Sequence, residues 1–492
     1  MNQVAAAIRE ALQALPSLAV TSAGKGPAVD EVFFPEGHAE VLDPEVSLVV
    51  GNRGMGKTFW SLVLADPQLR PEIEQRYLGV RHLGLDNIDV QLGFADAEGV
   101  LGSVSRHEIE SVPQKVPAEI IWRSVIVRHL AMMTKTAVPK KFKDLVSWVR
   151  ENPDEQLSIF RAAESCLSAE GKRILFIFDQ LDQLATNWER IQKLTQGLMK
   201  MALAMKSYKS IKIKVFMRPD QAENKYIFQF PDASKILGAS RVLNWKATDL
   251  FGLLFFEIAR IDGRSAEAFA EICQGEGVDT RKMHPRLRIP DALVGSAENQ
   301  GAIFDRIAGP LMGSGSKRGR PYTWITAHLA DARGEISPRT FLKVIKTAAE
   351  WDNPPPDGTA INFHGIQEGV RSASATRLAE LEEDYPWVSM ALEPLRGLLV
   401  PCEKKEIAER WTSAKTVSKI TSSYLGASAP IDIVLAGVLG DEADILIKLL
   451  REIGVMEERS NRKINVPDIF RVKAGILRKG GVTPQQRRRL QG

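Results

Sequence analysis

Short apolar runs alternate with amphipathic segments through the first half of the chain. Five runs have the length and composition of buried strands: Val46–Val50, Tyr77–Leu85, Ile174–Phe178, Ile211–Met217 and Arg241–Trp245. A helical pattern fills much of the interval between the second and third runs, from about residue 117 to residue 169. Strands that alternate with helices are typical of a parallel sheet with crossover helices. The first half is therefore predicted to be an α/β domain.

The second half of the chain is predicted to be mainly helical. Helical periodicity begins near Leu250, and loop-like stretches at 313–321 and 353–358 interrupt it. They separate a small helical unit, Tyr322–Glu350, from a C-terminal module that starts near Thr376. At the other end of the chain, the apolar spacing over the first fifteen residues predicts a short amphipathic helix rather than a signal peptide.

Composition narrows the class of protein. A chain of 492 residues with 44% hydrophobic and 26% charged residues is that of a globular protein with two to four domains. The three cysteines lie more than a hundred positions apart, which excludes a disulfide framework. Runs such as Ile174–Phe178 are far shorter than the roughly 20 apolar residues of a membrane span. We expect a cytoplasmic protein with no membrane segment.

A glycine-rich loop directly follows the first predicted strand. Residues 51–58, GNRGMGKT, match the GxxxxGK[ST] pattern between a strand-like run and a helix-compatible run. Glycines let successive amides point at phosphate oxygens, Lys57 reaches the β- and γ-phosphates, and the Thr58 hydroxyl binds Mg²⁺. A chance glycine loop is the alternative. The predicted ATP site comprises Gly51, Asn52, Arg53, Gly54, Met55, Gly56, Lys57 and Thr58.

A carboxylate ends the third predicted strand. Asp179 follows Ile174–Phe178, and at the tip of a buried parallel strand it would hold Mg²⁺ together with Thr58. An N-cap of the next helix is the alternative role for Asp179. The next residue is commonly a glutamate that polarises water, but in this chain it is Gln180, which orients water and cannot take its proton. Asp182 is the candidate base, and slow hydrolysis is expected.

Two arginines are candidate contacts to the terminal phosphate. Arg218 follows the strand Ile211–Met217, where its guanidinium would sense charge lost on hydrolysis. A salt bridge from Arg218 to Asp220 is the alternative. Arg339 lies near the start of an amphipathic helix, where the helix dipole disfavours a cation unless the side chain serves something else. We therefore expect Arg339 to reach phosphate.

The order of these motifs resembles the AAA+/STAND branch of P-loop NTPases and the layout of origin-recognition initiators. The resemblance covers about residues 30–470 and implies a Walker A loop, a Walker B strand, sensor 1 at Arg218 and sensor 2 at Arg339. Arg241 is the best positional match for an arginine finger. Initiators usually carry asparagine at sensor 1, so Arg218 is more similar to STAND and KAP-type ATPases. STAND-like ATPases of this layout occur often in antiphage defence.

The resemblance implies the fold class and the domain order. We expect a parallel P-loop NTPase sheet of the ASCE/AAA+ type, with a helical lid and a C-terminal winged-helix domain. The expected parts are an N-terminal lead-in, the ATPase core, the lid, the winged helix and a basic tail, at 1–45, 46–250, 251–352, 376–475 and 476–492.

The C-terminal module combines an amphipathic helix with a predicted hairpin. A helix at 441–452 precedes a strand at 455–459, a turn at 460–463 and a returning strand at 464–466. Although the whole chain has a net charge of only +4, positions 459–492 hold ten Lys and Arg residues and a single acid. The predicted contacts to nucleic-acid phosphates are Arg459, Arg462, Lys463, Arg487, Arg488 and Arg489. A protein-binding module with a solvated basic tail is the alternative.

Three functions fit this sequence. The first is an ATP-driven switch that couples nucleotide state to DNA or to an effector protein, and it includes assembly of an ATP-dependent homo-oligomer. The second is a replication or transposition regulator that assembles on DNA. The third is a nucleotide-binding scaffold with little hydrolysis, which the glutamine at position 180 suggests.

Overall fold

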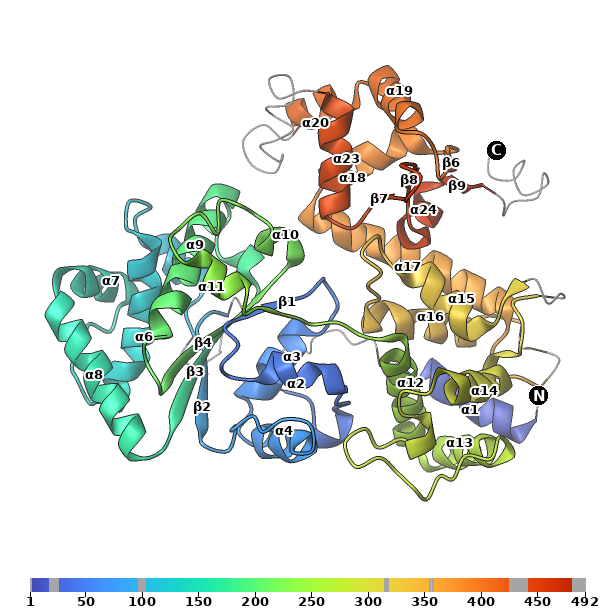
Figure 1. The fold of residues 1–492 in the computed structure, drawn as a ribbon, viewed down its shortest axis with the longest axis horizontal. Coiled ribbons are helices and arrows are strands. Elements are labelled where there is room, and N and C mark those ends of the chain that lie inside the picture. Colours follow the sequence, from blue (N-terminus) through green and yellow to red (C-terminus); the bar gives the residue numbers. More distant parts are fainter. Residues whose placement is uncertain are drawn as a thin grey trace. The chain divides into compact units, whose positions relative to one another are not determined.

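The computed structural model of the chain describes residues 2–16, 26–95, 103–313, 318–353, 355, 358–423 and 441–479 (Figure 1). Contacts within the chain divide it into two compact units. The core unit is Val20–Asn244, and the second unit combines Met1–Ala19 with Trp245–Gly492. No helix among these described residues is long and apolar enough to cross a membrane.

The core unit is built on one parallel sheet of five strands in the order β2-β3-β4-β1-β5. The strands are β1 (Leu48–Val50), β2 (Ile88–Leu92), β3 (Arg173–Phe178), β4 (Ile211–Met217) and β5 (Arg241–Val242). Strand β4 therefore lies between the strand that precedes the glycine loop and the strand that ends in the carboxylate, with Leu48 opposite Val215 and Ile174 opposite Ile211. This order is that of the ASCE class, so the predicted fold class is confirmed.

Helices cover both faces of this sheet (Figure 1). The face that carries Phe176, Phe178 and Ile213 packs into one continuous apolar core with α6 (Ala118–Met133), α7 (Phe142–Glu151), α8 (Pro153–Ala169) and α9 (Trp188–Met205). The opposite side is covered by α2 (Ala39–Leu42), α3 (Lys57–Ala65) and α4 (Leu69–Tyr77). The remaining elements of the unit are short: η1 (Val29–Glu31), η2 (Glu36–His38), α5 (Arg106–Ser111), η3 (Leu181–Gln183), α10 (Pro219–Ala222) and α11 (Ala233–Leu237).

The predicted strand at Tyr77–Leu85 is wrong. Tyr77 is the last residue of α4, and the edge strand β2 begins three residues after Leu85. The buried carboxylate of Glu74 accepts the backbone N–H groups of Leu83 (3.1 Å) and Leu85 (2.9 Å). Because these amides are bound to a side chain, the segment has no need of a neighbouring strand.

The other four predicted strands are present, three of them with changed ends. The first is shorter at its start and is observed as Leu48–Val50, whereas Ile211–Met217 has the predicted bounds. Strand β3 starts one residue earlier than predicted, at Arg173. The last strand contains only two residues, because Val242 is the last partner of β1. Local apolar content therefore located the strands, and pairing set their lengths.

The regular secondary structure described for the second unit up to residue 395 is helical, with loops between the helices and an isolated β-bridge between Met283 and Pro290. Its first helix, α1 (Gln3–Gln13), buries Ile8 and Leu12, as its spacing predicts, and contacts α12, α13 and α16. Arg9 of α1 donates to the carbonyl oxygens of Trp351 and Ala360. The other helices are α12 (Ala247–Ile261), α13 (Gly263–Gly275), η4 (Asp291–Leu293), α14 (Ala297–Ala308), α15 (Pro321–Leu329), α16 (Pro338–Glu350), α17 (Phe363–Asp384), α18 (Trp387–Leu392) and η6 (Glu393–Leu395).

The C-terminal module contains the predicted helix and hairpin. Helix α23 (Glu442–Glu452) precedes β7 (Glu457–Glu458), which pairs antiparallel with β8 (Ile464–Asn465). The module also contains β6 (Leu399–Val400), α19 (Lys404–Ala414), α20 (Thr416–Ser423), α24 (Asp468–Ala474) and β9 (Leu477–Arg478). Its α24 packs against α17 and α15 within the second unit. The predicted tail beyond residue 479 lies outside the described residues.

Candidate nucleotide-binding site

The glycine loop connects β1 to α3 through a backbone that requires glycine. Gly54 has φ +80° and Gly56, the residue that caps α3, has φ +102°, in the region that favours glycine. Gly51 is favoured for another reason, because a Cβ atom there would lie in tight contact, 3.1 Å from the Cβ atom of Leu243. The loop therefore curls back over the start of α3, as its sequence predicts.

The ammonium group of Lys57 is held by its own loop. Its Nζ atom donates to the carbonyl oxygens of Gly51 (2.8 Å) and Asn52 (3.1 Å). Burial lowers the pKa of Lys57 to about 8, and the nearby Asp179 carboxylate opposes that shift. A cation held at the mouth of a loop of amides is suited to exchange carbonyl partners for phosphate oxygens.

Thr58 and Asp179 meet where α3 begins and β3 ends. The Asp179 carboxylate accepts the Thr58 hydroxyl and the backbone N–H of Gln180, and only 7% of the residue is exposed. Burial raises its pKa, and the charge of Lys57 acts in the opposite direction. Among the described residues, nothing donates to the buried Asp179 Oδ2 atom. A carboxylate oxygen without a donor beside a hydroxyl fits the oxygen ligands that Mg²⁺ prefers.

This oxygen pair is not part of a larger metal cage. The described residues contain no group of three or more His, Cys, Asp or Glu side chains placed to hold a metal ion. Mg²⁺ is commonly held by one or two protein ligands while phosphates and water complete its coordination. Thr58 and Asp179 therefore fit a magnesium ion that arrives with a nucleotide.

The structure brings Arg218 and Asp182 into the same charge cluster as Lys57. Arg218 Nη1 lies 3.6 Å from Asp182 Oδ2, and its Nε atom lies 3.3 Å from Asp220 Oδ1. The alternative salt bridge with Asp220 is thus present, and the buried guanidinium contacts both acids. Gln180, with φ +56°, turns the chain sharply after β3 and places Asp182 in η3.

The other two predicted arginines form ion pairs with acids of their own units. Arg241, at the start of β5, forms an ion pair with Glu40, its Nε atom lying 2.6 Å from Glu40 Oε2. Arg339 belongs to the first turn of α16 in the second unit, where its Nη1 atom lies 3.3 Å from Glu380 Oε1. Their roles as arginine finger and as sensor 2 stay predictions.

The predicted basic contacts of the hairpin have acidic neighbours. Arg459 Nε lies 3.5 Å from Glu457 Oε1, and Lys463 Nζ lies 3.3 Å from Glu403 Oε1. Arg462 is exposed and occupies the left-handed position of the turn, with φ +61°. The three tail arginines, Arg487, Arg488 and Arg489, lie outside the described residues. Two of the three described cations are thus already paired within the chain.

Sequence reasoning missed the buried histidine beneath the P-loop helix. His38 is 1% exposed and accepts a hydrogen bond from Trp60, a residue of α3 (3.1 Å). Its other ring nitrogen lies 3.0 Å from the carbonyl oxygen of Asn244. Its partners are 22 and 206 positions away, so no local spacing points to them.

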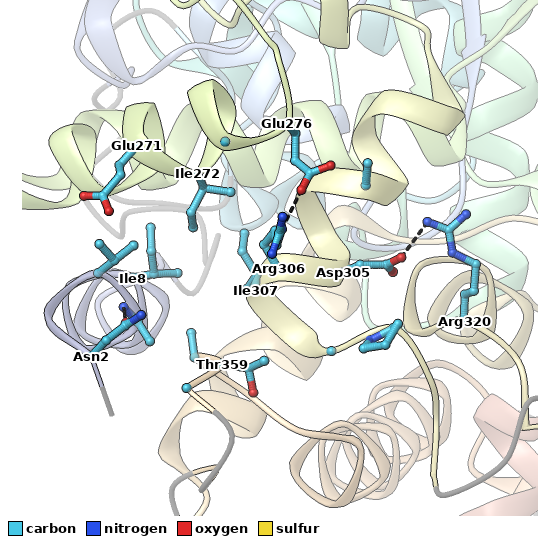
Figure 2. Close-up of a pocket in the computed structure, with 18 residues that line it drawn as sticks. Asn2, Ile8, Glu271, Ile272, Glu276, Asp305, Arg306, Ile307, Arg320 and Thr359 are labelled. Carbon is cyan, nitrogen blue, oxygen red and sulfur yellow. Dashed lines mark hydrogen bonds and ion pairs between the residues drawn. The ribbon is translucent and has the colours of Figure 1, made fainter.

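A separate cavity of about 780 Å³ lies in the second unit (Figure 2). It is bordered by α1, α13, α14 and the segment around Thr359. Two ion pairs line it, Arg306 with Glu276 and Arg320 with Asp305. None of the sequence-predicted site residues borders this cavity, and its wall charges largely neutralise one another.

Two solved structures are similar to this chain. The ORC2 protein of Aeropyrum pernix, solved as ADPNP-ADP complexes, has 12% sequence identity over 87% of each chain and a TM-score of 0.37. Cdc6p from Pyrobaculum aerophilum has 11% identity over 87% of this chain and 86% of its own, with a TM-score of 0.26. No protein-family model and no curated protein matches the sequence. Because both TM-scores lie below 0.5, the fold class rests on the strand order of the chain's own sheet.

Proposed function

We propose that the chain is an ATP-binding switch that hydrolyses ATP slowly and uses residues 51–58 as its phosphate loop. The observation that carries this proposal is the meeting of Thr58 and Asp179 beside Lys57, with one buried carboxylate oxygen left without a donor among the described residues. In a bare protein, such an oxygen is costly to bury. A nucleotide that brings Mg²⁺ would offset that cost.

Each residue of the site has a separate part in nucleotide binding. The amides of the curled loop donate to phosphate oxygens, and Lys57 exchanges its two carbonyl partners for the β- and γ-phosphates. Thr58 and Asp179 hold the magnesium ion, which neutralises charge between the phosphates. Arg218, from the neighbouring strand β4, supplies a buried cation for the terminal phosphate.

Slow hydrolysis is expected from the residues that follow Asp179 in the sequence. In the reaction, a water oxygen attacks the γ-phosphorus, the bond to the bridging oxygen breaks, and ADP and phosphate leave. Gln180 orients that water but does not remove its proton. Asp182 is the candidate acceptor, and its Oδ2 atom lies 3.6 Å from Arg218 Nη1.

We propose that the C-terminal module passes the nucleotide state to a partner. Because Arg459 and Lys463 are paired with acids of the same module, an effector protein is favoured over DNA as that partner. An antiphage role and ATP-dependent self-association belong to this proposal, and a role in replication or transposition is the alternative. Sedimentation with and without ATP tests self-association. Binding to duplex DNA should fall steeply with added salt if the DNA alternative holds.

Calorimetry with MgATP tests the nucleotide site. Lys57→Ala should weaken ATP binding by about a hundredfold or more, because it removes the cation from two phosphates. Lys200→Ala is the matched control, since Lys200 is a surface lysine of α9 paired with Glu119, and it should bind ATP like the unaltered chain. Equal ATP affinity in the Lys57→Ala variant and the control would refute the site.

Turnover measurements test the assignment of the reacting residues. Asp179→Asn should abolish Mg²⁺-dependent release of phosphate. Gln180→Glu should raise the rate if residue 180 stands beside the attacking water, whereas Asp182→Asn should lower it. If neither the residue 180 nor the residue 182 variant changes the rate, the proposed arrangement of the water is wrong.

A further inference from the structure

The last two residues of the core unit are linked to the strand before the phosphate loop and, through His38, to the helix after it. Before the loop, the Leu243 amide donates to the carbonyl oxygen of Val50 (2.7 Å), and a Cβ atom at Gly51 would be in tight contact, at 3.1 Å, with the Cβ atom of Leu243. The next residue is bound by His38, whose ring reaches the carbonyl oxygen of Asn244. The boundary between the two units falls directly after Asn244.

His38 completes a continuous path from the phosphate loop to this boundary. An indole N–H only donates, so the Trp60 bond to Nδ1 (3.1 Å) makes that nitrogen the acceptor. The imidazole hydrogen is then on Nε2, which donates to the Asn244 carbonyl oxygen (3.0 Å). Trp60 lies one turn after Lys57 in α3, and its ring borders the space above Gly56. Both hydrogen bonds of the imidazole have ordinary lengths.

Resting on the proposed nucleotide site, we propose that His38 is a positioning residue that couples the phosphate loop to the chain at Asn244 and Trp245. Nucleotide binding would draw Lys57 away from the Gly51 and Asn52 carbonyl oxygens and shift the first turn of α3. Trp60 belongs to that turn, so the shift would reach the Asn244 carbonyl oxygen through the imidazole. The path also has a branch at β5, because Leu243 is bound to the carbonyl oxygen of Val50 and would move with the start of the loop.

The environment of His38 suits a link that has to stay intact. Burial lowers its pKa to about 4, so the ring stays neutral and keeps one donor and one acceptor throughout the neutral range. Trp60 stacks edge-on to the ring, with the centroids 5.6 Å apart and the planes at 88°. The bond to Trp60 is buried and the bond to Asn244 is partly buried, so breaking either one leaves a shielded polar group without its partner.

Hydrogen–deuterium exchange of the backbone at 243–250 tests the coupling, with ADPNP and Mg²⁺ as the probe. In the unaltered chain, saturating ADPNP should slow exchange of these amides by about fivefold or more. Trp60→Phe removes the indole donor and keeps an aromatic ring at the site. This variant should keep its ADPNP affinity within about threefold while the exchange ratio falls below about twofold.

Trp122→Phe is the matched control. Trp122 is also fully buried in the core unit and donates its indole N–H to a backbone carbonyl, that of Leu194 (2.7 Å), but it lies in the core formed by α6–α9. The control therefore loses an equivalent hydrogen bond away from the proposed path. The ADPNP-dependent ratio at 243–250 should remain as in the unaltered chain.

Two substitutions of His38 divide the path into its links. His38→Asn retains an acceptor near the Nδ1 position and loses the bond to Asn244, whereas His38→Gln retains a donor near Nε2 and loses the bond to Trp60. Both should lose the coupling, because either break interrupts the path. They also replace Trp60→Phe as the test if that variant does not fold.

Several results would overturn the proposal. It fails if the variants that break the path keep the fivefold ratio, or if Trp122→Phe loses the ratio to the same extent. It also fails if the unaltered chain binds ADPNP and shows no change at 243–250, a result that leaves the nucleotide site intact. A chain that binds no ADPNP at all overturns the proposed function instead, and the coupling with it.

Discussion

Replacing Lys214 should destabilise the core unit far more than replacing its neighbour Lys212. Lys214 lies on the central strand β4 and is fully buried, although it carries a cation. Its Nζ atom donates to the carbonyl oxygens of Val41 (2.8 Å), Asp43 (2.8 Å) and Val46 (2.9 Å). One side chain thus binds three carbonyl groups of residues 41–46, the segment that leads into β1 and the phosphate loop.

The magnitude follows from the acceptors that Lys214→Met would leave behind. The Asp43 carbonyl oxygen also accepts the Val46 amide (3.0 Å), so the stranded acceptors are the carbonyl oxygens of Val41 and Val46. Each stranded buried carbonyl costs about 1–3 kcal/mol. The two carbonyls together would therefore cost about 2–6 kcal/mol. Because removing the ammonium also relieves its desolvation cost, we expect the lower part of that range, a loss of about 2–3 kcal/mol in the free energy of unfolding. Methionine cannot restore the rest of the lost stability, because the carbonyl groups belong to the backbone and remain when the side chain is replaced.

Urea unfolding of the two methionine variants is the assay. Lys212 lies two residues away on the same face of β4 and pairs with Glu45, a half-exposed acid, at 2.8 Å. Lys212→Met should therefore cost less than about 1 kcal/mol, as surface ion pairs do. Equal losses in the two variants, with equal slopes against urea, would show that the carbonyl contacts of Lys214 contribute nothing of their own.

The pH dependence of stability gives Lys214 a second signature. Burial lowers its pKa to about 7 from an ordinary value of 10.5, although Asp43 and Glu45 oppose the shift. Between these values the unfolded chain binds more protons than the folded chain, so this residue makes the free energy of unfolding rise with pH above about 7. Lys214→Met should lose that rise. If both proteins show the same pH dependence, the ammonium is not titrating in the folded chain.

Three further predictions concern other charged residues. Because burial lowers the pKa of Lys57 to about 8, calorimetry should show constant ATP affinity below that pH and a fall of up to about tenfold per pH unit above it, and constant affinity up to pH 9.5 would contradict this. Glu74→Gln should cost about 2–4 kcal/mol in urea unfolding, because one of the amides of Leu83 and Leu85 would meet an NH₂ group. A loss under about 0.5 kcal/mol would contradict the role of Glu74 in holding residues 83–85. Arg462→Gly should raise the thermal unfolding midpoint slightly, by a gain of about 1 kcal/mol, since φ is +61° there, and a lower midpoint would contradict it.

The parts of the site that the sequence could predict are those in which neighbouring residues act together. The loop at 51–58 carries its own curl, its cation and its hydroxyl within eight positions. Asp179 could be added because parallel strands end at one edge of a sheet, and a carboxylate that ends a buried strand must emerge there. The contact between Thr58 and Asp179 agrees with that reasoning.

Sequence reasoning fails where a side chain binds a group to which no local pattern connects it. The segment 77–85 has the apolar content of a strand, but the carboxylate of Glu74 binds two of its amides, and no periodicity reports that choice. Arg241 is similar, because its partner Glu40 is two hundred positions away and belongs to the segment before β1. Such pairings depend on the finished topology.

Lys214 and His38 both hold the segment that precedes β1 through hydrogen bonds to distant residues. Residues 36–46 contain the short helices η2 and α2, and helices of three or four residues leave many backbone groups that need partners from elsewhere. Lys214 supplies donors at one end of the segment, and Trp60 and Asn244 bind His38 at the other. A loop that was merely a connection would not need a buried ammonium and a buried imidazole. Because both anchors lie on the face of the sheet that carries α3, the segment is fixed to the same framework as the phosphate loop. The two hydrogen bonds of His38 connect this segment to α3 and to Asn244, which is why the exchange experiment is directed at this residue.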